Sequence, residues 1–293
     1  MKQGYMIYTE AEGKKNQAFI EMFQRAGEVH DLLFSFVSIE EYPTKPLPDL
    51  VLNRTRDPRV SWWYESHRIP VYHDSDITTV GNDKYQTLQV LQRRLPDAIR
   101  ETPWCPASFL ITQKQKTYLP LLREQIRESL GDVDTVVLKT VDGHGGSEVF
   151  RLPADPVGEE TIWKQTLAEL SGRKLLCQAW IDSGGQDLRV YILWGEIYAA
   201  VLRQGGADFR SNYSLGGQVQ PYLLSGREKS YISQFVQALG GRRLAMAGVD
   251  FLLSGDGALV FNELEEMAGS RMLYQCTSFD IVRDFVSILK KRM

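Results

Sequence analysis

Short apolar segments alternate with a helical segment at the start of the chain, and this alternation constrains the fold more than any other sequence feature. Four apolar runs have the length and composition of strands, at residues 4–9, 32–37, 50–53 and 69–72. Between the first two runs, Phe19, Ile20 and Phe23 recur at helical spacing. Strands that alternate with helices form parallel β-α units, so the sequence predicts a parallel sheet in this region.

The remainder of the chain predicts amphipathic helices and antiparallel hairpins. Glycine-containing turns separate three pairs of expected strands: 135–139 from 149–152, 188–194 from 196–203, and 248–253 from 258–264. A further strand is expected at 174–180. Helical spacing of apolar residues or helix-start signals predict helices at 60–66, 82–95, 119–130, 159–170, 228–239 and 280–291. The expected fold class is therefore mixed α/β.

Composition excludes several classes of protein. The 293 residues carry 34 Lys and Arg against 37 Asp and Glu, which gives a net charge of -3 and no basic excess for nucleic acid or an anionic membrane. Three cysteines without a C-x-x-C motif disfavour a disulfide scaffold or a zinc knuckle. The chain has no apolar run of transmembrane length and no signal-peptide pattern at its start. We therefore expect a cytoplasmic protein without nucleic-acid or membrane partners.

A glycine-rich loop is the first candidate for chemistry. Gly143, Gly145 and Gly146 lie between two expected strands, so the loop is neither a Walker-type loop nor a dinucleotide fingerprint. Backbone N–H groups of such a hairpin tip can still fold over phosphates, and Lys139 could meet a phosphate as a point charge. The alternative is an ordinary turn.

Acidic residues on two adjacent strands are the second candidate. Strand alternation places Glu263 and Glu265 on one face, and Asp250 lies on the preceding expected strand. These acids interrupt strongly apolar runs, and carboxylates that converge need a cation, for which Mg²⁺ is suited. The alternative is a solvated polar face. A third candidate is the run 208–212, with Arg210 and with Arg203 nearby, where a plain charged loop is the alternative.

The order of these motifs is more specific than any one of them. D-L-R at 187–189, D-F-R-S-N at 208–212, A-G-V-D at 247–250 and N-E-L-E at 262–265 follow one another. This series resembles the ATP-grasp superfamily, most closely the branch of ribosomal-protein S6 modification enzymes and glutathione synthetases. The resemblance covers about residues 80–290. It implies a pre-ATP-grasp, Rossmann-like domain at 1–80, a central ATP-grasp subdomain at 81–180 and a C-terminal subdomain at 181–293.

The resemblance also implies roles for individual residues. Lys139, Arg210 and Asn212 correspond to residues at the reacting centre, and Asp250, Glu263 and Glu265 to Mg²⁺ ligands, with two ions expected and Mn²⁺ as a substitute. The backbone of Ala179 and Trp180 would read the adenine edge. The residues that correspond to ATP-binding positions are Lys84, Lys139, Gly143, His144, Gly145, Gly146, Gln178, Ala179, Trp180, Ile181, Asp187 and Arg203.

The chain departs from the family pattern at three places. Glu265 stands where Asn is usual, Ala179 stands where Glu is frequent, and the sequence 267–271 replaces a common Ser-Pro-Gly. The last departure changes the wall near the acceptor substrate, so the identity of the substrate cannot be carried over. Arg54 and Arg56 follow a strand end of the first domain, where open α/β sheets bind ligands, and could hold a substrate carboxylate.

The resemblance implies an ATP-dependent carboxylate–amine ligase that forms an amide or peptide bond through an acyl phosphate and releases ADP and phosphate. Small molecules, peptides or protein tails are the expected substrates, and a homo-oligomer is left open. Two alternatives remain: a small-molecule kinase on the same fold, and a non-catalytic ATP-binding module. The set of Lys, Arg and acidic residues argues against the second alternative, because a decayed site usually loses one of them.

Overall fold

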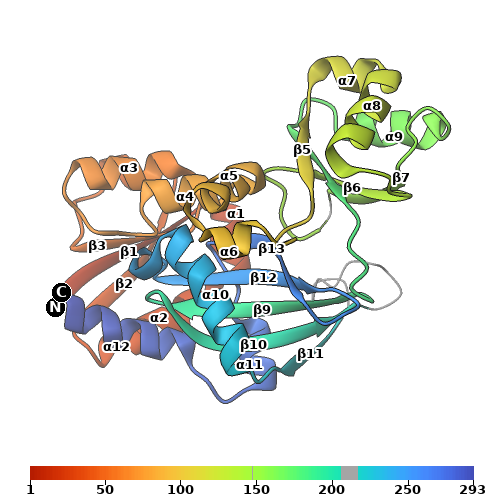
Figure 1. Ribbon diagram of the computed structural model, residues 1–293. Coiled ribbons are helices and arrows are strands. Elements are labelled where there is room, and N and C mark those ends of the chain that lie inside the picture. The colour runs from red at the N-terminus through yellow and green to blue at the C-terminus, as the bar shows by residue number, and fades with distance from the viewer. Residues whose placement is uncertain (147, 206–216) are drawn as a thin grey trace.

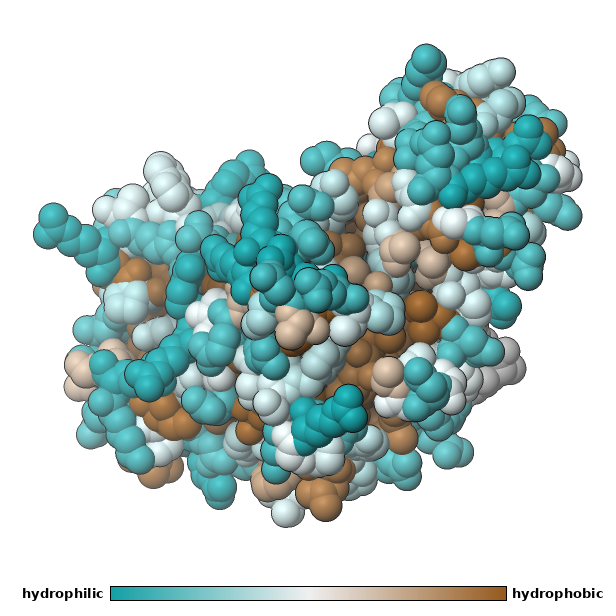
Figure 2. All heavy atoms as spheres, viewed as in Figure 1, coloured by the Kyte–Doolittle hydropathy of each residue, from teal (hydrophilic) through white to brown (hydrophobic). Residues whose placement is uncertain are grey.

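The computed structural model describes residues 1–146, 148–205 and 217–293 of the chain. These residues form three sheets, and the four-stranded antiparallel sheet with its helices stands apart from a larger body in Figure 1. The surface is hollowed between the two parts, and apolar residues gather where they meet (Figure 2). Within the described residues, no helix has the length and apolar character of a membrane span.

The N-terminal sheet is parallel, as the alternation predicted. Its strand order is β2-β1-β3-β4, formed by β1 (Lys2–Tyr8), β2 (Leu32–Ser38), β3 (Leu50–Asn53) and β4 (Val71–Tyr72). The connecting helices are α1 (Glu10–Lys15), α2 (Gln17–Glu28), α3 (Pro58–Ser66) and α4 (Ser75–Gly81), with a short turn of 3₁₀-helix at Tyr42–Thr44. Phe23 of α2 is fully buried against Phe34 of β2, which fixes the helix on the sheet.

The part that stands apart from the larger body contains an antiparallel sheet of order β5-β8-β6-β7. Its strands are β5 (Ser108–Ile111), β6 (Thr135–Thr140), β7 (Val149–Pro153) and β8 (Leu175–Ala179). Its helices are α7 (Gln113–Thr117), α8 (Leu119–Leu130) and α9 (Glu160–Glu169). Trp163 of α9 is fully buried in this core and donates its indole N–H to the carbonyl of Pro153 at 2.9 Å.

The third sheet has the order β11-β10-β9-β12-β13, and each adjacent pair is antiparallel. Its strands are β9 (Gln186–Leu193), β10 (Glu196–Gln204), β11 (Gln218–Pro221), β12 (Met246–Leu253) and β13 (Leu259–Glu265). Apolar side chains of one face pack with α5 (Lys84–Arg94), α6 (Asp97–Arg100) and α10 (Gly226–Leu239). The 3₁₀-helix Gly241–Arg243, α11 (Arg271–Cys276) and α12 (Ile281–Arg292) complete this part.

The opposite face of the third sheet shares one apolar core with the N-terminal sheet. Tyr191 and Leu193 of β9 belong to the same buried cluster as Phe23 of α2 and Phe285 of α12. The rings of Phe23 and Phe285 meet edge to face, with centroids 5.6 Å apart. The two sheets are therefore held together by ordinary core packing.

The three predicted hairpins are present, and one of them shows why glycine is required. Gly195, between β9 and β10, has φ +81°, and a Cβ there would lie 2.6 Å from the backbone of Gly241.

The packing of α5 also bears on the domain boundaries. Leu88 and Leu91 of α5 lie in the core of the third sheet, so we propose that residues 84–104 belong with the C-terminal subdomain rather than with the central one.

Candidate active site

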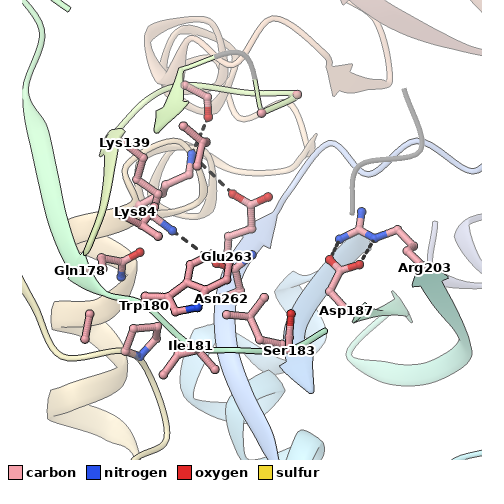
Figure 3. Close-up of a pocket in the computed structure, with 18 residues that line it drawn as sticks. Lys84, Lys139, Gln178, Trp180, Ile181, Ser183, Asp187, Arg203, Asn262 and Glu263 are labelled. Carbon is pink, nitrogen blue, oxygen red and sulfur yellow. Dashed lines mark hydrogen bonds and ion pairs between the residues drawn. The ribbon is translucent and has the colours of Figure 1, made fainter. Parts of the chain in front are cut away.

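A pocket lies between the antiparallel four-stranded sheet and the five-stranded sheet, and it collects the predicted ATP-binding residues (Figure 3). Eleven of the twelve predicted positions line it, and His144 is the exception. The other lining residues are Pro106, Val137, Val149, Ser183, Leu252, Asn262 and Glu263. The ATP-binding role of each residue stays a prediction, but the fold brings them to one place.

Two lysines approach one end of the pocket from different elements. Lys84 is the first residue of α5, and Asp83 caps the N-terminus of this helix. The Nζ of Lys84 donates to the carbonyl of Gly143 and lies 3.5 Å from the carboxylate of Glu263. Lys139 of β6 is buried and donates to Asn262 Oδ1 at 3.3 Å. Burial lowers the pKa of Lys139 to about 8, and Lys84 adds to this effect. Two neighbouring ammonium groups in a closed pocket suit a polyphosphate.

Substitution of Lys139 is expected to weaken ATP binding. Lys139→Ala removes one charged phosphate contact, which is worth about 1.5–3 kcal/mol of binding free energy. The native protein should also lose affinity as the pH rises through about 8, because the protonated lysine binds the phosphates and the free protein sheds that proton. Calorimetric titration with ATP at pH 7 and pH 9 measures both effects. An alanine variant with native affinity, or with the native pH dependence, would place Lys139 outside the site.

The glycine-rich loop lines the pocket beside these lysines, and the family resemblance predicts that residues 142–147 form a flap over the phosphates. Gly145 and Gly146 have φ of +70° and +77°, which L side chains rarely adopt, and a Cβ at Gly143 would collide with the Thr140 hydroxyl. Arg173 braces the base of the flap, with ion pairs to Asp142 at 2.8 Å and to Glu148 at 2.5 Å. Ser147, at the end of the predicted flap, lies outside the described residues. The loop thus has a base held by ion pairs and a tip whose backbone conformation favours glycine.

ATP is expected to protect this flap from proteolysis. Three glycines among residues 142–147 make the free loop costly in entropy to fix, and phosphate contacts would supply the compensating free energy. Digestion with subtilisin, with and without a non-hydrolysable ATP analogue, measures the rate of cleavage at each peptide bond. Slower cleavage within residues 142–147, at an unchanged rate elsewhere, is expected. Equal cleavage of the loop under both conditions contradicts its role as a flap.

The predicted adenine hinge follows β8. Gln178 is buried and donates to the hydroxyl of Ser108 at 2.7 Å, and the guanidinium of Arg151 lies 4.3 Å from the ring centroid of Trp180. The backbone N–H groups of Ala179 and Trp180 donate to carbonyls of Ala107 and Thr135, at 2.9 and 3.3 Å. These N–H donors are thus engaged within the protein, and the reading of the adenine edge by the backbone of Ala179 and Trp180 stays a prediction. Ile181 is the next hinge residue along the pocket wall.

Two buried arginines and two buried aspartates join the strands at the other side of the pocket. Asp250 of β12 accepts from Arg189 of β9 through both of its oxygens, at 2.7 and 2.6 Å, and from Arg203 of β10 at 2.7 Å. Arg203 also pairs with Asp187 through two hydrogen bonds (Figure 3). The arginines hold the pKa of Asp250 at about 2, although burial alone would raise it. This charge cluster fixes Asp187 and Arg203 in the pocket wall.

The three predicted Mg²⁺ ligands are placed differently from one another. Glu263 faces the pocket, where Lys84 keeps its pKa below the usual value despite burial. Burial raises the pKa of Glu265, and the nearby carboxylates of Glu263 and Asp250 raise it further. Asp250 receives three guanidinium hydrogen bonds, so of the four acceptor sites on its carboxylate one remains.

These acids fit a hard cation, since crowded carboxylates favour a bound positive charge and oxygen ligands suit Mg²⁺. Glu263 and Glu265 are the residues that would hold it, and Asp250 has one oxygen site left for it. Within the described residues, no three acidic, histidine or cysteine side chains already converge as a metal site.

Two of the predicted catalytic residues, Arg210 and Asn212, lie outside the described residues. His144 lies in the flap but does not line the pocket. Burial lowers its pKa to about 4, with help from Arg56 and Lys84, so the imidazole is neutral near pH 7. The charged groups that affect its pKa include Arg56 of the N-terminal domain as well as the pocket residues Lys84 and Glu263.

Asn262 is one of the pocket residues that the sequence did not predict, and its polar side chain bonds to Lys139. A β-bulge between Asp250 and Phe251 pairs Asp250 with Glu263 but Phe251 with Phe261, so that Asn262 is the extra residue. Strict alternation would point Asn262 away from Glu263, and the bulge brings both to the pocket instead. No sequence signal marks a bulge of this kind.

Comparison with known proteins decides the family. A model of the RimK-like ATP-grasp domain matches residues 81–289. The chain belongs to the RimK-like ATP-grasp family. The predicted resemblance is thereby confirmed, and the protein is an ATP-grasp ligase.

Relatives of this ATP-grasp ligase occur in several bacteria. An uncharacterised protein of Mycoplasma pneumoniae is 25% identical over 291 residues, which cover 96% of this chain and 90% of that protein. A protein of Mannheimia succiniciproducens named probable alpha-L-glutamate ligase is 32% identical over 159 residues, which cover 54% of this chain and 51% of that protein. The chain thus aligns with about half of the second relative.

Solved structures share the fold over its whole length. D-cycloserine synthetase DcsG superposes with a TM-score of 0.73 at 13% identity and covers 99% of both chains. A RimK domain protein from Sphaerobacter thermophilus gives a TM-score of 0.68 at 16% identity, covering 97% of this chain and 98% of that one. These likenesses confirm the expected α/β ATP-grasp architecture. ATP-grasp ligases use ATP with Mg²⁺, and the neighbour PsnB was solved with Mg and ADP.

Proposed function

We propose that this ATP-grasp ligase joins a carboxylate to an amine through an acyl phosphate. A substrate carboxylate oxygen attacks the terminal phosphorus of ATP, and ADP leaves. The amine nitrogen then attacks the acyl carbon, phosphate leaves, and the nitrogen loses a proton as the amide forms. No protein nucleophile takes part, so the protein acts by positioning and by neutralising charge.

The residues of the pocket have separate tasks in this scheme. Lys84 and Lys139 hold the phosphates, the flap at 142–147 excludes water, and the hinge from Gln178 to Ile181 holds the base. Arg210 and Asn212, known only from the sequence, would stabilise the acyl phosphate and the tetrahedral intermediate. Bound Mg²⁺, as two ions or replaced by Mn²⁺, would neutralise the terminal phosphates. Glu263 and Glu265, with the remaining oxygen site of Asp250, would hold it.

One observation carries the proposal. Eleven residues that were predicted to bind ATP line a single pocket, and they come from the antiparallel four-stranded sheet, the five-stranded sheet and the segments that connect them. The names of the relatives guide the choice of substrates. One relative is named probable alpha-L-glutamate ligase, and a structural neighbour is titled as an ATP-grasp ligase complexed with a minimal precursor. We therefore propose L-glutamate and short acidic peptides as the first substrates to test.

The test is a screen for phosphate release with ATP and Mg²⁺ over pairs of carboxylic acids and amines, with products identified by mass. Release that requires both substrates, and a product lighter by one water than their sum, is expected. The Lys139→Ala variant, with its weakened ATP binding, serves as the control and should release phosphate more slowly at the same ATP concentration. A stable phosphorylated product formed without an amine would instead show a kinase, and ATP binding without turnover over the whole screen would show a binding module.

A further inference from the structure

Two arginines at the carboxyl end of the N-terminal sheet have buried N–H groups that find no acceptor among residues 1–146, 148–205 and 217–293. Arg56 makes no side-chain hydrogen bond or ion pair with any described residue, and its Nε is buried. The Nε of Arg54 is also buried and has no partner in the described part of the chain, although its Nη2 donates to the carbonyl of Met267 at 3.3 Å. A buried donor without an acceptor costs free energy, so these side chains suit an acceptor that the described residues do not supply.

The backbone at Arg56 supports the same interpretation. Arg56 has φ +62°, a left-handed conformation that a long side chain rarely adopts. Asn82 secures this conformation, since its Nδ2 donates to the carbonyl of Arg56 at 3.3 Å and to Glu266 Oε1 at 2.9 Å. Strained residues held by their surroundings occur preferentially at ligand sites.

These contacts place Arg56 beside residues 266–267, next to the segment that is expected to form the wall near the acceptor substrate. Met267 begins the segment 267–271 that replaces the family's Ser-Pro-Gly, and Glu266 directly precedes it. Asn82 bonds to Glu266 and Arg54 to Met267, which attaches the Arg56 loop to this part of the chain. The charge of Arg56 lowers the pKa of His144 in the flap and the pKa of Glu12. The carboxylate of Glu12 is already paired with Lys15 at 2.9 Å.

We propose that Arg56 binds a carboxylate of the substrate that does not take part in the reaction. This inference rests on the proposed ligase function. Arg56 does not line the nucleotide pocket, whereas Glu263 does, so an anion on Arg56 is set apart from the reacting phosphate. A guanidinium matches a carboxylate in a bidentate manner.

The substrate class follows from this placement. One substrate carries a free carboxylate in addition to its reacting group, as a dicarboxylic acid, an amino acid or a peptide with a free α-carboxylate does. Arg54, held by Met267 and stacked 5.3 Å from the ring centroid of Phe19, is a positioning residue for the loop.

The experiment measures the binding of two carboxylate probes, L-glutamate and glutarate, by NMR titration in the presence of ADP and Mg²⁺. It compares the native protein with Arg56→Gln, Arg56→Lys and the matched control Arg59→Gln. Arg59 lies three residues further along, but its side chain is 87% exposed and pairs with Asp57. We expect Arg56→Gln to weaken probe binding about 10- to 100-fold, Arg56→Lys to weaken it less, and Arg59→Gln to leave it unchanged.

ADP affinity and melting temperature, measured on the same samples, show that each variant is folded and keeps its nucleotide site. Native probe affinity in Arg56→Gln, or no binding of either probe by the native protein, overturns the proposal. The ATP turnover assay separates this outcome from a failure of the ligase function. If the probes bind through Arg56 but no acid and amine pair is ever joined, the subsite stands and the ligase function fails. If an active enzyme keeps its native KM in Arg56→Gln, the subsite fails alone.

Discussion

Replacement of Glu263 by alanine is expected to reduce ATP turnover about 10²- to 10³-fold, the size of effect seen when a positioned electrostatic group is removed from an active site. Glu263 is the predicted metal ligand that lines the pocket, and it lies 3.5 Å from Lys84. If Glu263 holds Mg²⁺ as predicted, the variant would leave the ion one carboxylate short and the terminal phosphates less neutralised. ADP release across a Mg²⁺ titration measures the loss.

Glu265→Asn is the informative partner of this variant. It restores the residue that the family more often has, removes one of the crowded negative charges and keeps an oxygen ligand. We expect an active protein that needs several-fold more Mg²⁺ for half-maximal turnover. If Glu265→Asn has the native Mg²⁺ requirement, Glu265 is not a ligand. If Glu263→Ala also keeps full activity, the metal site lies elsewhere.

Much of the fold was predictable because the periodic signals in this chain are long. The helices α8 and α10 and the three hairpins appear where apolar spacing and turn residues predict them. The elements that escaped prediction are short or polar. β5 has four residues between Pro106 and Thr112, and β11 is a polar edge strand, Gln218–Pro221. Tertiary pairing with β8 and β10, rather than local sequence, defines these two strands.

The candidate site was also predictable only in part. Ordered motifs were enough to bring eleven ATP-binding candidates to one pocket, because each motif follows its own strand or turn. Strand order and register could not be read from them. In the third sheet, β9 lies between β10 and β12. Asp250 of β12 is therefore paired with Arg189 of β9, and Arg203 of β10 donates to the Asp250 carboxylate at 2.7 Å. The partial use of Asp250 by arginines therefore became visible only in the structure.

Removal of the Asp250 carboxylate is expected to destabilise the whole fold. The side chain of Asp250 is fully buried, and those of Arg189 and Arg203 are 7% and 4% exposed. Asp250→Ala leaves both guanidinium groups short of their shared partner in a dry core, and breaking a buried ion pair in this way costs about 3–5 kcal/mol of unfolding free energy. Urea unfolding, followed by circular dichroism, measures the loss.

A surface ion pair of the same chemistry provides the control. Asp76 is 80% exposed and pairs with Arg243 at 2.9 Å, so Asp76→Ala should change the stability by no more than about 1 kcal/mol. Asp250→Asn retains the shape and two of the acceptor sites, so it should fall between the two alanine variants. Arg203 also holds Asp187 in the pocket wall, and the Asp250 variants should therefore bind ATP more weakly even under conditions where they remain folded. An Asp250→Ala protein as stable as Asp76→Ala would show that the cluster contributes nothing to the fold, and native ATP affinity in Asp250→Asn would show that it does not shape the site.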